Sequence, residues 1–192
     1  ILFTQNTAYS IDMTDHGSAA ASSLMTALRT TYDASIAIGY SPLVSTSIYC
    51  GDYSKQQLLW VMAGNYAVSQ GEYTGAELRQ MMEWLVNVKD NGANPIRHRN
   101  YMPVTSGMEY KVTEYEQGKF RLEELTVNGA PLDDTATYTV FVAGTDVWIE
   151  NEVYCSCPMP ENLKTKRTEY AIEGADLSLI HISEPTRHLR IS

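Results

Sequence analysis

The feature that most constrains the fold is the segment NYAVSQGEYTGAELRQMMEWL, residues 65–85, which reads as a β-strand running through one threonine into an α-helix. Thr74 is followed three residues later by Glu77, the capping-box pattern in which each side chain accepts a hydrogen bond from the other residue's backbone N–H. Asn91 and Gly92 provide a C-cap signal, so the helix is predicted to end there. Its apolar residues form one stripe that must face a core, at Leu78, Met81, Met82, Leu85 and Val88.

Three elements are predicted upstream of this junction. The Ala-rich segment 18–31 has leucines at helical spacing and is predicted to pack closely on a sheet. Residues 35–40 read as a short buried strand. Ser54 and Gln57 repeat the capping-box pattern and predict the start of another helix.

After Pro95 the apolar pattern changes to alternation, which is typical of strands. Gly118 and the pair Asn128-Gly129 mark two hairpin turns, and residues 137–143 read as a further strand. The alternating apolar positions are Met108, Tyr110, Val112, Phe120 and Leu122. We therefore predict an α+β (mixed α/β) fold, with helices packed on a mixed sheet and a strand-rich second half.

The predicted domain spans residues 1–157, and residues 158–176 read as a peripheral tail. The chain opens on ILFTQN, without an initiator Met or a signal segment, so we expect it to begin inside a longer protein. Residues 177–192 lack stable periodicity, and Leu177 to Arg187 matches one reading frame of a common transposase-type sequencing adapter. We interpret this end as adapter read-through, the alternative being a natural mobile C-terminus.

Composition and motifs argue against several functions. The net charge of -9 disfavours a nucleic-acid-binding face, and no apolar run is long enough to predict a membrane span. Cysteine and histidine spacings do not match a zinc site, and Ser106 lies in a segment better read as a turn at Gly107 than as a nucleophile elbow. Asp15 lies close to Asp12 and His16, but Asp15 and Ser18 are explained more simply as capping residues of the helix that follows. No catalytic residue and no metal ligand are predicted.

Four segments in order resemble the C-terminal domain of the 5'-nucleotidase family, the bifunctional nucleotidase and UDP-sugar hydrolase group. They are SIYCGDYSKQQLLWVMAGN at 47–65, YTGAELRQMMEWL at 73–85, YMPVTSGMEYKV at 101–112 and LTVNGAPLDDTATYTVFVAGTD at 125–146. The resemblance covers roughly residues 17–154. It implies a substrate-binding domain of a phosphohydrolase that removes phosphate from nucleotides, inactive alone. Divalent metal ions and the catalytic residues are then expected in an upstream metallophosphoesterase domain, in an extracellular, cell-wall or periplasmic protein.

The resemblance also implies three substrate-binding positions: Asn65, and Tyr66 and Trp148 as aromatics that stack on the base. Each has a simpler interpretation, Asn65 as a turn residue, Tyr66 as a strand residue and Trp148 as core. The chain departs from the family where an arginine is expected, because Ser45 stands there and cannot replace a guanidinium. Three functions remain open: a nucleotide-binding domain, a binding or structural module that has lost nucleotide binding, and a domain for another phosphoester.

Overall fold

The computed structural model describes residues 3–10, 18–40, 43–54, 56–57, 61, 67–87, 102–116, 119–143 and 168–171. Its helices and strands confirm the predicted α+β class. In chain order they are β1 (Phe3–Gln5), α1 (Ala19–Thr31), β2 (Ile36–Tyr40), β3 (Gly51–Tyr53), β4 (Ala67–Thr74), α3 (Gly75–Leu85), β5 (Pro103–Ser106), β6 (Met108–Glu116), β7 (Lys119–Val127), β8 (Ala130–Pro131), β9 (Thr137–Ala143) and β10 (Thr168–Ala171).

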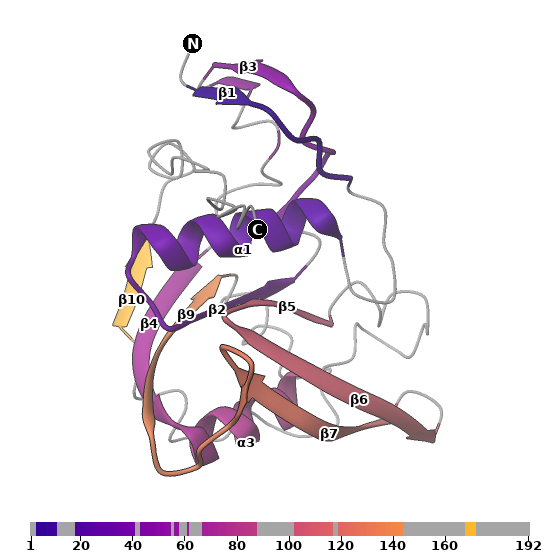
Figure 1. The fold of residues 1–192 in the computed structure, drawn as a ribbon, viewed down its shortest axis with the longest axis vertical. Coiled ribbons are helices and arrows are strands. Elements are labelled where there is room, and N and C mark those ends of the chain that lie inside the picture. The colour runs from indigo at the N-terminus through magenta and orange to yellow at the C-terminus, as the bar shows by residue number, and fades with distance from the viewer. Residues whose placement is uncertain are drawn as a thin grey trace, which may run out of the picture.

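A five-stranded mixed sheet with the order β10-β4-β9-β2-β5 forms the centre of the fold. β2 and β9 are parallel neighbours, and the other pairs are antiparallel. α1 lies along one side of this sheet, while α3 and the β6–β7 ribbon lie on the other (Figure 1). Every residue of β2 is buried, as expected of a strand covered on both faces.

The helix predicted at residues 18–31 is confirmed as α1. Its N-cap is Ser18, whose side chain accepts a hydrogen bond from the N–H of Ala21. The alanines let the helix lie close to the sheet, and Gly39 of β2 completes that approach. A Cβ at Gly39 would lie 2.8 Å from the Met25 methyl carbon, so a larger residue there would force the Met25 side chain to move.

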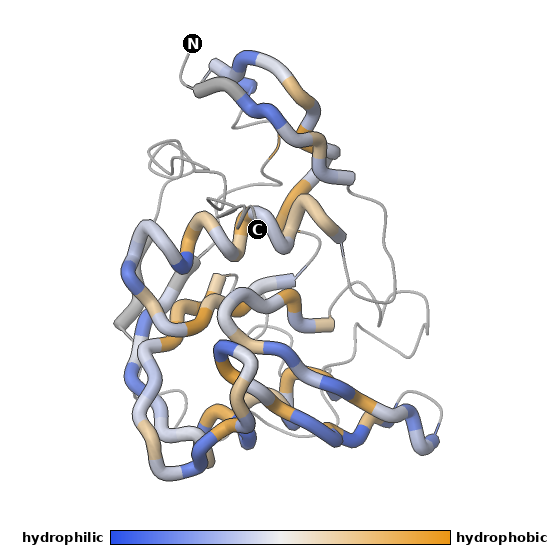
Figure 2. Tube along the Cα trace, viewed as in Figure 1, coloured by the Kyte–Doolittle hydropathy of each residue, from blue (hydrophilic) through white to orange (hydrophobic). Residues whose placement is uncertain are grey.

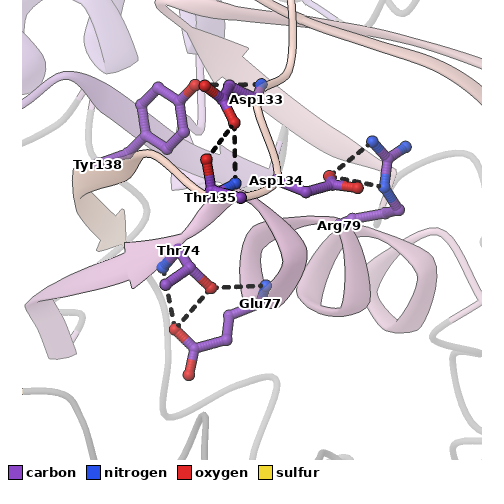
Figure 3. A network of polar contacts seen from close by, with 7 residues as sticks. All are labelled: Thr74, Glu77, Arg79, Asp133, Asp134, Thr135 and Tyr138. Carbon is purple, nitrogen blue, oxygen red and sulfur yellow. Dashed lines mark hydrogen bonds and ion pairs between the residues drawn. The ribbon is translucent and has the colours of Figure 1, made fainter.

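The strand-to-helix junction is also confirmed. β4 ends at Thr74, and both halves of the predicted capping box with Glu77 are present (Figure 3). The next two N–H groups of the helix also have partners: Gly75 donates to the carbonyl of Ala136 at 2.9 Å, and Ala76 donates to that of Asp134 at 3.0 Å. The first turn of α3 is therefore fixed to the loop before β9.

α3 ends at Leu85, earlier than the predicted end at Asn91 and Gly92. Asn87 gives the physical reason. Its side-chain amide donates to the carbonyls of Glu83 at 2.9 Å and Phe120 at 3.0 Å, and its oxygen accepts from the N–H of Phe120 at 2.9 Å. This pairing with β7 ends the helix. Val88, the last predicted stripe residue, lies outside the described residues, whereas the other four are buried and Trp84 joins them.

Both predicted hairpins of the second half are present. β6 pairs antiparallel with β7 around the predicted Gly118 turn, whose own residues lie outside the described part. Figure 2 shows apolar and hydrophilic positions alternating along this ribbon. Asn128 and Gly129 have φ values of 51° and 80°, the left-handed conformation that a tight turn of this type requires.

Five short strands were not predicted. β1 and β3 pair with each other as a separate two-stranded ribbon. β5 lies on the segment predicted as a turn; the turn is shorter than expected, since only Gly107, with φ 79°, separates β5 from β6. β8 is a two-residue partner of β7, and β10 lies inside the predicted tail and pairs with β4.

Candidate functional site

The candidate site is at one end of the five-stranded sheet, where the parallel strands β2 and β9 both finish. Tyr40, the last residue of β2, pairs with Pro103, the first of β5. Ala143, the last residue of β9, pairs with Val68 near the start of β4. We call this the loop end of the sheet. It is the candidate site because ligands of open α/β sheets bind beyond the carboxyl ends of the parallel strands.

The predicted substrate-binding residues Asn65, Tyr66 and Trp148 all lie outside the described residues. The described strands nevertheless place their points of attachment. β4 begins at Ala67, directly after Tyr66, and β9 ends at Ala143, five residues before Trp148. The segments that carry the predicted residues therefore join the sheet at neighbouring strands and at the same end.

Ser45 occupies the position where the family resemblance implies an arginine. Its N–H donates to the carbonyl of Val61 at 2.7 Å, and its hydroxyl donates to the same carbonyl at 3.1 Å. The residue is exposed and uncharged. It therefore ties the loop after β2 to the chain segment before β4 and supplies no cation for an anionic ligand.

The N-terminus of α1 also points toward the loop end. Met25 lies over Gly39, and Arg29 lies near Ser106, which pairs with Ala37, so α1 runs antiparallel to β2. A helix N-terminus favours anions through its free N–H groups. Here the N–H of Ala20 donates to the carbonyl of Ser10 and the next N–H is taken by the Ser18 cap. Two of the N–H groups at this helix end are therefore already bonded within the protein. Asp12, Asp15 and His16 lie outside the described residues.

The ionisable side chain of Tyr110, near the loop end, has a structural role. The Tyr110 hydroxyl donates to the carbonyl of Pro103 at 2.7 Å, and burial raises the pKa of Tyr110 above its usual value. This tyrosine is therefore a neutral donor at neutral pH. Hydrogen bonds from Thr135 lower the pKa of Asp133, but that residue lies near the opposite end of the sheet, with the α3 junction (Figure 3).

Metal ligation finds no support in the described part of the chain, where no group of three His, Cys, Asp or Glu side chains is placed to hold an ion. Cys50 is exposed and free of a disulfide. Neither described helix has the length and apolarity of a membrane span.

The fold and the loop end define a mixed-sheet α+β domain whose candidate site is built from loops at one end of the sheet. The chain belongs to the family described as 5'-nucleotidase, C-terminal domain, which it matches over residues 4–145. The resemblance seen in the four sequence segments is thereby confirmed. A search of curated proteins found no match.

Solved structures share this fold. The chain is similar to the 5'-nucleotidase precursor of Thermus thermophilus, at 18% identity over 93% of this chain and 35% of that one, with a TM-score of 0.64. It is also similar to Haemophilus influenzae NAD nucleotidase (NadN), at 14% identity over 92% and 34%, with a TM-score of 0.66. A third relative is the Thermus thermophilus sulfate thiohydrolase SoxB, at 17% identity over 74% and 27%, with a TM-score of 0.53. The chain spans about a third of the length of the first two.

Proposed function

We propose that this chain is the substrate-binding domain of a 5'-nucleotidase-like phosphohydrolase that removes phosphate from nucleotides. The observation that carries the proposal is the family match over residues 4–145. It is supported by two nucleotidases among the structural relatives and by the common sheet end to which the segments of Asn65, Tyr66 and Trp148 are attached.

In this proposal hydrolysis takes place in an upstream metallophosphoesterase domain that holds divalent metal ions. The present domain would hold the nucleotide, with Tyr66 and Trp148 stacking on its base and Asn65 contacting it. The whole protein would act outside the cytoplasm, in an extracellular, cell-wall or periplasmic location. All three features rest on the family and not on residues of the described part.

The first experiment uses the longer protein that includes the upstream region. We expect metal-dependent release of phosphate from nucleotides, lost on treatment with a chelator and reduced when residues 1–157 are deleted. Phosphate release that survives this deletion unchanged would argue against a substrate-binding role.

The second experiment measures binding to this chain directly by calorimetric titration with AMP, adenosine and UDP-sugars. Stacking of one base on an aromatic ring is worth about 1–3 kcal/mol, so Tyr66→Ala and Trp148→Ala should each weaken binding by about 5- to 150-fold. The matched control is Tyr115→Ala, since Tyr115 is an aromatic side chain that is 56% exposed on the β6–β7 ribbon. Equal losses in all three variants would point to a general effect on folding.

Ser45 favours a second candidate function, a domain for a different ester. Its donors are directed at Val61 and it carries no guanidinium, and one structural relative is a sulfate thiohydrolase. Saturable binding of a non-nucleotide ester, with no binding of AMP or adenosine, would favour this candidate. A chain that binds none of these ligands would instead favour the binding or structural module.

A further inference from the structure

Arg29 in the last turn of α1 is held by a chain of hydroxyl groups. Its Nε donates to the Oγ of Ser106 at 3.0 Å, and that oxygen lies 3.1 Å from the Oγ1 of Thr26. Thr26 donates its own proton to the carbonyl of Ser22 at 3.0 Å. Because each hydroxyl has one proton, Ser106 must donate to Thr26, and the protons run in one direction from Arg29 to Ser22.

This chain of bonds fixes the guanidinium through Nε and does not use Nη1 or Nη2. Nε has a partner, and both hydroxyl protons are used. Among the bonds of the described residues, none reaches Nη1 or Nη2 of Arg29, which is half-buried. The two Nη atoms form the fork that matches a pair of anion oxygens.

Arg29 is in this respect unlike the other cations of the described part of the chain. Each of the others has an acidic or aromatic partner. The pairs are Arg79–Asp134 at 2.8 Å, Lys111–Glu124 at 3.4 Å, Lys119–Glu116 at 2.7 Å, and Arg121 over the Tyr115 ring at 5.2 Å. Among the described residues, the only hydrogen-bond partner of the Arg29 side chain is a neutral hydroxyl, although burial makes an unpaired charge unfavourable.

Gly107 makes room for this arrangement. A Cβ there would lie 3.0 Å from the Cδ of Arg29 and would also contact the carbonyl of Ser35. The stem of Arg29 therefore lies directly over the bend between β5 and β6. Ser106 pairs with Ala37 near the start of β2, so this place is at the end of the sheet opposite the loop end.

We propose that Arg29 binds an oxoanion through its Nη1 and Nη2 atoms, at a site separate from the candidate nucleotide site. The ligand class is a carboxylate or a tetrahedral oxoanion such as phosphate, whose oxygens face the fork. Ser106 and Thr26 have no proton left to donate and act as positioning residues that hold the guanidinium. The proposed anion site requires neither the nucleotide nor the upstream domain, so its test is independent of the proposed function.

The test is an NMR titration of the 192-residue chain with sodium phosphate, sodium sulfate and sodium acetate, at ionic strength held constant with sodium chloride. We expect the Arg29 Nε–H signal, assigned by its loss in Arg29→Gln, to shift and saturate. Backbone signals of Gly107 should follow it in the wild type and stay unchanged in Arg29→Gln. Saturation by phosphate and sulfate alone would identify a tetrahedral ligand, and saturation by acetate alone a carboxylate; either supports the proposal.

Three variants separate a site from a general salt effect. Arg79→Gln is the matched control, because Arg79 already has Asp134 as its partner, and it should leave the Arg29 response unchanged. Ser106→Ala keeps the charge but removes the anchor of Nε, and we expect binding to weaken by about threefold or more. Arg29→Lys keeps the charge without the fork and should also bind more weakly. Linear shifts without saturation, or Gly107 shifts that persist in Arg29→Gln, would overturn the proposal.

Discussion

Replacing Gly75 with alanine tests how closely α3 is joined to the loop before β9. Gly75 is the first residue of α3, where alanine would ordinarily be the better helix former. In this structure, however, a Cβ at Gly75 would collide with the carbonyl oxygen of Asp133 and would lie 2.7 Å from its carbonyl carbon and 2.8 Å from the Cα of Asp134. These are backbone atoms, so the whole loop would have to move.

The expected loss follows from the bonds that this movement breaks. The N–H groups of Gly75 and Ala76 donate to the loop carbonyls of Ala136 and Asp134. Two backbone hydrogen bonds at about 0.5–1.5 kcal/mol each give a loss of about 1–3 kcal/mol, and the strain of overpacking adds about 1 kcal/mol or more. The helix propensity of alanine returns at most about 1 kcal/mol. The free energy of unfolding should therefore fall by about 2 kcal/mol.

Urea denaturation followed by circular dichroism measures this change as a lower midpoint with an unchanged slope. The matched control is Ala76→Gly, which loses helix propensity at an exposed position and keeps its N–H bond to Asp134. It should cost no more than about 1 kcal/mol. A Gly75→Ala variant as stable as the wild type, or more stable, would refute the close-contact reasoning.

Two further predictions concern Asn87, after α3, and Tyr110, in β6. Asn87→Ala removes the amide bonds to Glu83 and Phe120 and should lower the free energy of unfolding by about 1–3 kcal/mol, measured as a urea midpoint; Asn87→Asp, which keeps only the acceptor, should recover part of this loss. Burial raises the pKa of Tyr110 from 10.0, so the folded state keeps a proton that the unfolded state releases. Above about pH 10 the wild type should lose stability by up to about 1.4 kcal/mol per pH unit relative to Tyr110→Phe, and parallel pH profiles for the two proteins would contradict this.

The elements that could be predicted from sequence are those specified by neighbouring residues. The capping box of Thr74 and Glu77, the cap of Ser18 and the turn at Asn128 each involve residues at most three apart, and all are present. Helical and strand periodicity added α1, α3 and the β6–β7 ribbon. Local chemistry was thus sufficient for most of the fold.

The elements that were missed depend on distant residues. The end of α3 is set by Asn87 and Phe120, which are 33 residues apart, so no local signal could correct the expected end at Gly92. β1 and β3 have three residues each, too few to show a period. Gly107 made the segment of β5 read as a turn, although pairing with β2 makes it a strand.

The candidate site was accessible to sequence reasoning only through the family resemblance. Asn65, Tyr66 and Trp148 remain predictions, because they lie outside the described residues. The bond of Ser45 to Val61 and the fixing of Arg29 by Ser106 join residues 16 and 77 positions apart. No spacing rule in one sequence identifies such pairs.

The pairing of β10 with β4 has a consequence for where this domain can be cut. The family match ends at residue 145, but β10, at residues 168–171, covers the outer edge of β4 through four register pairs. A fragment ending at 145 would leave the backbone N–H and C=O groups of that strand open to another chain, and exposed edges of this kind promote strand exchange and aggregation. By covering this edge, β10 should reduce self-association. We therefore expect a fragment that extends past Ala171 to be more soluble than one that ends at 145.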